Sequence, residues 1–542
     1  MQKLVEPSKE LGYSQLYIDF LADKPSARKF FLSRGIPSTV EEIDRHSYPR
    51  AEMIQILQRQ NKLFGSSPAA MAAIEKLADP RAICVVTGQQ AGLYAQCTLV
   101  QLKAFAVAKK AALLEKELNR PVVPIFWIAG DDHDVAEVSQ VGVLNQAGQL
   151  NIFKYNANQD VDLPVGMVKL SNEVSLKEVY DQYRAAVGES EFTADLYRII
   201  ESSYTPGDTF VTAFGKMMAA LTASYSTVYF SPTDPAVSKL AAPFFRKLIE
   251  DNDAVRKNIQ ATNEQILQAG YSLQVEKSEA ATHLFHTGST GRKPITTGTH
   301  GSFNVSGESW SSAQLRSLVE TAPEQLTPDV LLRPVMQSYL FPVVIQYGGP
   351  AEIVYLAQLN PLFSQFGLPT PTHLSRPTVT LIEKKFEKVL SEYDIAYIEL
   401  AGDIEQLVNR VMGKSFPTDL ESRFTTVRAD IGRNFDQLTR DSLAFDPSLV
   451  EFARQTSGKI DFAVKALEEK VFSSHKKKSK ETREKIYRLE IALHPRRGLQ
   501  DRTINIGNYI AKYGFGVISF MYDRMDINQT SLQLLYLSEL ND

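Results

Sequence analysis

Two apolar runs in the first quarter of the chain each end in a polar, glycine-containing turn. Residues 83–86 lead into a glycine turn at 87–94, and residues 122–128 lead into the acidic turn, Ala-Gly-Asp-Asp-His-Asp at 129–134. Between the runs, apolar residues recur at helical spacing: Leu99, Leu102, Ala106 and Leu113. Strand, turn, helix and strand in this order predict an α/β fold with a doubly wound parallel sheet, whose ligands bind beyond the carboxyl ends of the strands.

The same order of apolar run and polar turn recurs twice further along the chain. Residues 227–230 precede Ser-Pro-Thr-Asp-Pro and are predicted to form a third strand of this sheet. The core resumes at 331–334, and a strand at 341–345 leads into a polar segment at 346–352 and another helix. Because parallel strands share one carboxyl edge, the sequence predicts one cavity at three strand tips, those reached by Val86, Ile128 and Ile345.

Changes in composition divide the chain into segments. An irregular insertion is expected near 150–200, and a Gly-, Ser-, Thr- and His-rich insertion near 260–325. Alternating runs such as 271–275 predict a small β structure in the second insertion. The predicted segments are a helical region at 1–80, the sheet core at 81–380, an antiparallel coiled coil at 381–495, and a C-terminal segment at 496–542 that returns to the core.

Long helices with little glycine follow the predicted core. Thr418 and Glu421 predict a capping box at the start of the first, and a turn at 445–447 precedes the second. Apolar residues recur along both: Leu420, Phe424, Val427, Ile431, Phe435 and Leu438, then Ile460, Val464, Leu467 and Val471. The pattern predicts a coiled-coil hairpin that self-associates; the alternative is a helical domain packed on its own core. The basic run at 476–480 is either a solvated helix face, the favoured interpretation, or an anion-binding patch.

Composition narrows the class of protein further. The chain has 542 residues, 44% of them hydrophobic and 23% charged, with a net charge of −4, so no global field favours nucleic acid. No apolar run approaches the roughly 20 residues of a membrane span, and the first residues lack a secretory signal, so we expect a cytoplasmic protein without a membrane partner. Two cysteines fit a reducing compartment. Cys84 is predicted to be buried and inert, whereas Cys97 can face the crevice.

The glycine turn has the residue types of an anion site. Free backbone amides between Gly88 and Gly92, at the start of a helix, can hold a phosphate, although a plain tight turn uses the same residues. Gln89 and Gln90 either hydrogen-bond a ligand or face solvent. The spacing matches neither GxGxxG nor a Walker sequence, so it does not decide between these interpretations.

The acidic turn concentrates four ionisable residues at one strand end: Asp131, Asp132, His133 and Asp134. No CxxC or HExxH spacing supports zinc, and adjacent side chains cannot all reach one ion. Two of them can bind Mg²⁺ with a nucleotide, or bind a substrate amine. The alternative is a helix start capped by acids, but the position at a strand end favours function.

The last predicted strand ends in a similar way. Gly348 and Gly349 permit close backbone approach, and Glu352 lies at the start of the next helix. Arg333, next to Pro334, has the planar fork of donors that pairs with a phosphate or a carboxylate. A structural ion pair is the alternative for Arg333.

These motifs together resemble the cysteine-adding enzymes of bacillithiol biosynthesis, the BshC family. The segments that carry the resemblance are 85–93, 124–134, 331–334, 347–353 and 494–502. They occur in order over most of the chain. Two positions depart from the family pattern: Asp501 replaces an expected glutamate, and Ala95-Gln96-Cys97 replaces a segment that more often resembles Thr-Gly-Pro.

The resemblance implies a Rossmann-type core with connective insertions and a coiled coil used for homodimerisation. It also implies a ligase that joins L-cysteine to the amine of glucosaminyl-malate. Amide formation needs an activated carboxylate, so ATP with Mg²⁺ is expected, through cysteinyl-AMP or an acyl phosphate, and no structural zinc. The alternatives are a non-catalytic substrate-binding scaffold on the same fold and a nucleotidyltransferase with another acceptor.

The core also resembles class I aminoacyl-tRNA synthetases in layout. The glycine turn and His373–Arg376 occupy the places of the two synthetase signatures without matching them in detail. His133 and Asp131 are then the expected catalytic pair that orients the amine, with His133 as the base. The expected nucleotide or substrate contacts are Thr87, Gly88, Gln89, Gln90, Gly92, Asp132, Asp134, Arg333, Gly348, Gly349, Glu352, His373 and Arg376.

Overall fold

A computed structural model describes residues 3–31, 35–157, 162–289, 291–413 and 419–540. The chain forms two compact units. The core unit comprises residues 1–384 and 495–542, and the helical unit comprises residues 385–494. Within the described ranges, no helix combines the length and apolar character needed to cross a membrane.

A parallel sheet in the order β13-β12-β2-β3-β6 is the centre of the core unit. Its strands are β2 (Ile83–Gln89), β3 (Val122–Ile128), β6 (Val228–Phe230), β12 (Val343–Gly348) and β13 (Thr372–Ser375). The expected α/β class and the third strand are therefore confirmed. β2 is longer than predicted, because Thr87, Gly88 and Gln89 still pair with β3 before the chain turns.

Helices pack against the sheet, and other helices form the segment of the chain before β2. α6 (Thr98–Leu118) packs on β2 and β3, and α4 (Arg50–Phe64) packs on β6 and on α10 (Phe210–Leu221). Of the apolar residues that recur at helical spacing in α6, Leu113 is 45% exposed, because only Ala111 and Leu114 turn inward near the end of the helix. The other helices before β2 are α1 (Gln15–Leu21), α2 (Pro25–Arg28), α3 (Ile36–Asp44) and α5 (Pro68–Glu75).

The two ends of the chain meet in a second, three-stranded sheet. β15 (Leu532–Tyr536) lies between β1 (Leu4–Val5) and β14 (Val379–Ile382). The C-terminal part of the core unit also supplies α21 (Gly507–Tyr513) and α22 (Gly516–Arg524). This pairing places residues 495–502 beside the main sheet, where they contribute to the candidate site.

Two insertions interrupt the core. The first holds the hairpin β4 (Gln140–Leu144) and β5 (Leu150–Lys154), then α8 (Glu173–Val187) and α9 (Thr193–Ser203). After α11 (Pro235–Glu250) and α12 (Asn252–Gln268), the second contains a five-stranded sheet and α13 (Ser312–Thr321). The strands of that sheet are β7 (Ala281–Gly288), β8 (Gly291–Thr297), β9 (Phe303–Val305), β10 (Glu308–Trp310) and β11 (Leu326–Pro328).

The small β structure is thus present, but residues 271–275 are not part of it. The side chain of Gln358 hydrogen-bonds both the N–H and the carbonyl of Val275, so this backbone has no strand partner. The Tyr271 side chain is buried and donates to Asp19. The alternation of polar and apolar residues here reflects individual side-chain contacts and not a strand.

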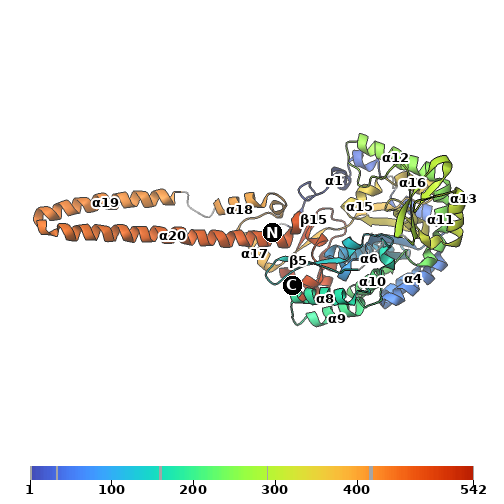
Figure 1. Ribbon diagram of the computed structural model, residues 1–542, viewed down its shortest axis with the longest axis horizontal. Coiled ribbons are helices and arrows are strands. Elements are labelled where there is room, and N and C mark those ends of the chain that lie inside the picture. Colours follow the sequence, from blue (N-terminus) through green and yellow to red (C-terminus); the bar gives the residue numbers. More distant parts are fainter. Residues whose placement is uncertain (1–2, 32–34, 158–161, 290, 414–418, 541–542) are drawn as a thin grey trace. The chain divides into compact units, whose positions relative to one another are not determined.

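The helical unit contains the predicted hairpin. α19 (Leu420–Phe445) and α20 (Val450–Leu493) run antiparallel and in contact, preceded by α18 (Ile404–Gly413) (Figure 1). Arg428 on α19 pairs with Asp461 and Glu468 on α20. The predicted Thr418 cap lies outside the described residues. Of the basic run, Lys477 and Lys480 are exposed, consistent with a solvated face.

Candidate functional site

A cavity of about 210 Å³ lies at the carboxyl edge of the parallel sheet. The ends of β2, β3 and β12 line it, with α6, α14 (Arg333–Leu340) and α15 (Pro350–Leu356). Nine of the predicted site residues line the cavity: Thr87, Gly88, Gln89, Gln90, Asp132, Arg333, Gly349, Glu352 and Arg376. The three strand tips therefore surround one cavity, as the sequence predicts.

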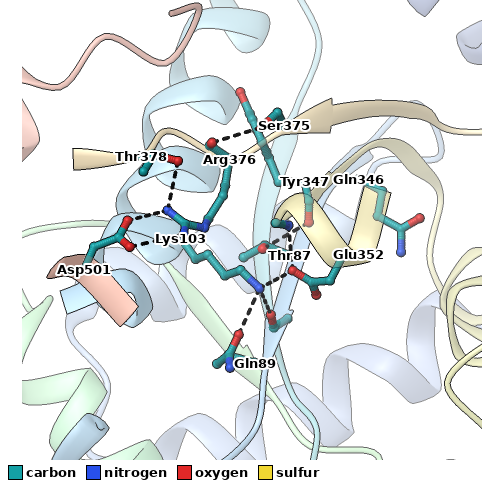
Figure 2. Close-up of polar contacts among 12 residues, drawn as sticks. Thr87, Gln89, Lys103, Gln346, Tyr347, Glu352, Ser375, Arg376, Thr378 and Asp501 are labelled. Carbon is teal, nitrogen blue, oxygen red and sulfur yellow. Dashed lines mark hydrogen bonds and ion pairs between the residues drawn. The ribbon is translucent and has the colours of Figure 1, made fainter. Parts of the chain in front are cut away.

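Lys103 of α6 is a buried residue that lines this cavity. Its side chain is 1% exposed. Its Nζ donates to the Gly88 carbonyl at 2.7 Å, to Gln89 Oε1 at 2.9 Å and to Glu352 Oε2 at 2.5 Å (Figure 2). Burial lowers the pKa of Lys103, against the opposing effect of the Glu352 charge. One ammonium thus connects β2 to the start of α15.

Glu352 is held by two donors on one oxygen. Oε2 accepts from Lys103 and, at 2.6 Å, from the backbone N–H of Gly349, the N-cap of α15. Burial alone would raise the pKa of Glu352, but Lys103 and the Gly349 N–H together lower it. The carboxylate is therefore ionised at neutral pH while it faces the cavity.

Arg376 and Asp501 form an ion pair that is completely buried. Arg376 Nη1 donates to Asp501 Oδ2 at 2.6 Å and to the Pro377 carbonyl at 2.8 Å, and both charged side chains are 0% exposed (Figure 2). Burial disfavours the charged guanidinium, but Asp501 more than offsets this and raises the pKa of Arg376. The pair joins the end of β13 to the C-terminal segment at the cavity wall.

Asp131 and Arg333 form a second buried pair behind the cavity. Arg333 Nε lies 3.4 Å from Asp131 Oδ2, and Asp131 is 1% exposed and does not line the cavity. Neither Asp131 oxygen has a hydrogen-bond partner among the described residues. Burial lowers the pKa of Arg333, but the charge of Asp131 reverses the effect and raises it. Asp131 thus contacts the cavity only through Arg333.

Asp132 faces the cavity beside them. Its Oδ2 accepts from Gln90 Nε2 at 2.8 Å, and its Oδ1 accepts from the His133 N–H at 2.7 Å. Burial raises the pKa of Asp132, but the nearby Arg333 charge and these hydrogen bonds lower it overall. Among the residues that the structure describes, Asp132 and Glu352 are the carboxylates that line the cavity.

His133 and Asp134 lie outside the cavity wall. Asp134 caps α7 (Val135–Val138) by accepting from the Glu137 N–H. For Asp134 this is the alternative interpretation of the acidic turn, a helix start capped by an acid. Arg292 on β8 donates to His133 Nδ1 at 3.1 Å. Arg292 is itself fixed by the Phe285 ring, 3.7 Å from its guanidinium carbon, and by Thr327. The second insertion therefore orients His133.

The glycine turn does not lead directly into an α-helix: Gly92 precedes the 3-10 turn Leu93–Ala95, and the anion site, one of the two interpretations of this turn, stays a prediction. α6 begins only at Thr98, whose N–H and hydroxyl both donate to the Ile504 carbonyl. Gly92 lies away from the cavity, where its carbonyl accepts from the Tyr204 hydroxyl. Gly88 remains important for packing, because a Cβ there would lie 3.1 Å from the Trp127 carbonyl. Gly348 lies within β12 and does not line the cavity.

Both cysteines are buried, as predicted for Cys84, and Cys97 does not face the crevice. Burial raises the pKa of each thiol to about 12. A thiol with such a pKa is protonated at neutral pH and is a poor nucleophile. Neither cysteine lines the cavity.

His373 is buried away from the cavity wall. Its ring lies between Phe31 and Phe363, and neither ring nitrogen has a hydrogen-bond partner among the described residues. This apolar burial lowers the pKa of His373 to about 4. The imidazole is therefore neutral in the folded protein at neutral pH.

Burial of His373 predicts an acid-dependent loss of stability. Above a pH of 6.5 the imidazole is neutral in both states, whereas between 6.5 and about 4 only the unfolded chain binds the proton. The free energy of unfolding should therefore fall as the pH is lowered, by about 3 kcal/mol from this residue at the acid end. Urea unfolding of the protein and of His373→Leu across this range measures the difference. Parallel pH profiles for the two proteins would contradict the prediction.

Several polar atoms of the cavity-lining residues have no hydrogen-bond partner among the described residues. They are Trp127 Nε1, Arg333 Nε, Gln346 Oε1, Tyr347 Oη and Arg376 Nε. A buried polar group without a partner costs about 1–3 kcal/mol, so such groups are uncommon. Their concentration at one cavity is typical of a site that binds a polar ligand.

Lys103, Arg292, Gln346 and Arg502 are site residues that the sequence analysis missed. Lys103 interrupts the apolar stretch Leu102–Ala108, and a lysine in a buried helix face usually has a specific partner. Gln346 and Arg502 lie in the segments 346–352 and 494–502, which the sequence analysis names without giving these two residues a role, whereas Arg292 carries no comparable local signal. Among the described residues, no group of three or more His, Cys, Asp or Glu side chains is arranged to hold a metal ion.

Comparisons with known proteins agree with this architecture. Residues 2–377 match the family model for the N-terminal Rossmann-like domain of bacillithiol biosynthesis BshC, and residues 379–537 match the model for its C-terminal coiled-coil domain. Proteins named "Putative cysteine ligase BshC" are similar over most of their length. The protein from Koribacter versatilis is 30% identical over 94% of this chain and 95% of its own, and that from Salinibacter ruber is 28% identical over 94% and 93%.

Proposed function

Because the chain belongs to the BshC family of bacillithiol biosynthesis, we propose that it is the ligase that joins L-cysteine to the amine of glucosaminyl-malate. The bond formed is an amide between the cysteine carboxyl carbon and the sugar nitrogen. The observation that carries the proposal is the single cavity at the three strand tips, which holds charges of both signs.

The charges of the cavity suit substrates that carry amines and carboxylates. Asp132 and Glu352 are ionised acceptors for an amine. Arg333 and Arg502 also line the cavity, and Arg333 Nε has no hydrogen-bond partner among the described residues. Arginine pairs with carboxylates and phosphates through two parallel hydrogen bonds. These two arginines therefore suit the malate carboxylates or the phosphates of a nucleotide.

ATP is the proposed source of activation, since a free carboxylate does not condense with an amine in water. Mg²⁺ bound with a nucleotide usually takes one or two carboxylates together with phosphate oxygens. Asp132 is the carboxylate that suits this role, and Arg333 and Arg502 suit the phosphates. His133 remains the candidate base beside Asp132, and Asp131 would act by positioning Arg333.

The test is an assay of the purified full chain with cysteine, glucosaminyl-malate and ATP. We expect a thiol product whose formation matches the release of AMP and pyrophosphate, with serine in place of cysteine as the control. ADP release instead of AMP would favour an acyl phosphate. Binding of both substrates without product would favour the scaffold alternative and overturn the proposal.

We also propose that two copies associate through the hairpin of α19 and α20. Val427, Leu438 and Leu467 belong to the predicted apolar stripes, yet they are 48%, 59% and 58% exposed in the single chain. Apolar residues at coiled-coil spacing that their own hairpin leaves exposed are typical of an association surface.

Charges on this stripe should convert the dimer to a monomer. We expect Val427→Glu together with Leu438→Glu to halve the mass in solution, measured by light scattering after size exclusion. Ala429→Glu is the matched control, because Ala429 is exposed on nearly the opposite side of the same helix. An unchanged mass in the double variant, or a monomeric starting protein, would exclude this surface.

A further inference from the structure

We propose that Glu352 is the anchor for a protonated primary amine of the substrate, and that Lys103 is a positioning residue for Glu352. The inference rests on the proposed function only for the identity of the amine. Two molecules could supply that group, L-cysteine through its α-amine and glucosaminyl-malate through its sugar amine. The structure assigns a protonated primary amine to Glu352, and the experiment below distinguishes which of the two molecules supplies it.

Glu352 offers one oxygen to the protein and one to the cavity. Oε2 accepts from both Lys103 and Gly349, whereas Oε1 has no partner among the described residues. The side chain is 29% exposed and lines the cavity. Figure 2 shows the second carboxylate oxygen directed away from Lys103. An ionised carboxylate with a free oxygen in a cavity suits a donor that carries positive charge.

Lys103 has no N–H donor left to bind a substrate directly. An ammonium has three N–H donors, and those of Lys103 already bind Gly88, Gln89 and Glu352. Its position nevertheless fixes the carboxylate, because Nζ lies only 2.5 Å from Oε2. Lys103 therefore acts on the substrate through Glu352.

A neighbouring donor suits the carboxylate of an amino acid. Arg376 Nε has no hydrogen-bond partner, and it would lie 3.6 Å from a Cβ placed on Gly349, whose N–H binds Glu352. An acceptor and a guanidinium N–H without a partner among the described residues thus both lie close to Gly349. This arrangement favours a ligand that carries both an ammonium and an anionic group.

A purely structural role is the competing interpretation. Glu352 completes the capping box of α15 through Gly349, and the pair with Lys103 joins two elements of the core. That role predicts changes in stability when Glu352 is altered. It predicts no change in the preference between ligands that differ only in their amine.

The experiment measures binding by calorimetry in the absence of ATP, so it does not depend on turnover. Cysteine is compared with 3-mercaptopropionate, which lacks the amine, and glucosaminyl-malate with its N-acetyl derivative. We expect one of these pairs to differ by about 10- to 100-fold in affinity, the range for a hydrogen bond between charged groups. Glu352→Gln should abolish that ratio and leave the ratio of the other pair unchanged. Glu115→Gln, at a half-exposed pair with Lys76, is the control.

The pair whose ratio collapses identifies the amine that Glu352 binds. Ratios in both pairs that survive Glu352→Gln would overturn the inference, as would equal affinities within both pairs for the unaltered protein. A chain that binds with the expected ratios but forms no amide would leave the inference standing and refute the proposed function. The two failures are therefore distinguishable.

The positioning role of Lys103 is tested with Lys103→Met and with the double variant Lys103→Met/Glu352→Gln. If Lys103 acts only through Glu352, the double variant should show the same affinity ratio as Glu352→Gln alone. A lower affinity for the amine-bearing ligand in the double variant than in Glu352→Gln alone would mean that Lys103 contacts the ligand directly. The double variant also removes both buried charges, so it should fold even if Lys103→Met does not.

Discussion

Asp501→Asn should lower the free energy of unfolding of the core unit by about 3–5 kcal/mol. The substitution leaves the Arg376 guanidinium buried without its counter-charge, at a site where both side chains are 0% exposed. Removing one member of a buried ion pair is much more destabilising than removing the pair, because the remaining charge cannot be solvated. Urea unfolding followed by tryptophan fluorescence suits the measurement, since Trp127 and Trp310 both lie in the core unit.

A surface ion pair provides the control for this prediction. Asp461→Asn on α20 breaks the exposed pair with Arg428, and such pairs contribute about 0–1 kcal/mol. Asp501→Glu, which restores the residue expected from the family pattern, tests how tightly the pair is packed. A loss below about 1 kcal/mol for Asp501→Asn would show that the guanidinium finds other acceptors, for example the Pro377 carbonyl.

The sheet is the part of the fold that local pattern predicts best. β3 coincides with the predicted run, Val122–Ile128, because all of its side chains are buried and therefore apolar. β2 continues past the end of its apolar run, since Thr87, Gly88 and Gln89 pair with a neighbouring strand through their backbone. Polarity alone does not reveal such pairing. The same limit explains residues 271–275, where alternation occurs without a strand.

Residues that line the candidate site were predictable, but the hydrogen bonds and ion pairs that hold them were not. Strand ends identify Gln90, Asp132 and Glu352, because the carboxyl edge of a parallel sheet gathers whatever residues follow its strands. The partners of these residues come from distant parts of the chain. Lys103 lies 249 positions from Glu352, and Arg292 lies 159 positions from His133. No local spacing in the sequence encodes such contacts. The sequence therefore predicts residues that line the cavity, but not the distant residues that hold them in position.

Arg333→Met should cause the largest loss of amide-forming activity, tenfold or more in kcat/KM, about the contribution of a charge-assisted hydrogen bond. Arg333 lines the cavity and its side chain is 15% exposed, so its guanidinium can pair with an anionic group of a substrate. The same change leaves Asp131 buried beside an apolar side chain, at a site where it is 1% exposed. The single variant should therefore lose stability as well as activity, and the two effects need to be separated.

The double variant Asp131→Asn/Arg333→Met separates them. Without a buried charge on either side, it should recover most of the stability that Arg333→Met loses, which urea unfolding measures. Its activity should stay as low as that of the single variant, because the guanidinium that binds the substrate is still missing. Recovery of activity together with stability would mean that Arg333 serves only to neutralise Asp131. Low activity in a stable protein would place Arg333 in contact with the substrate and leave Asp131 as the residue that positions it.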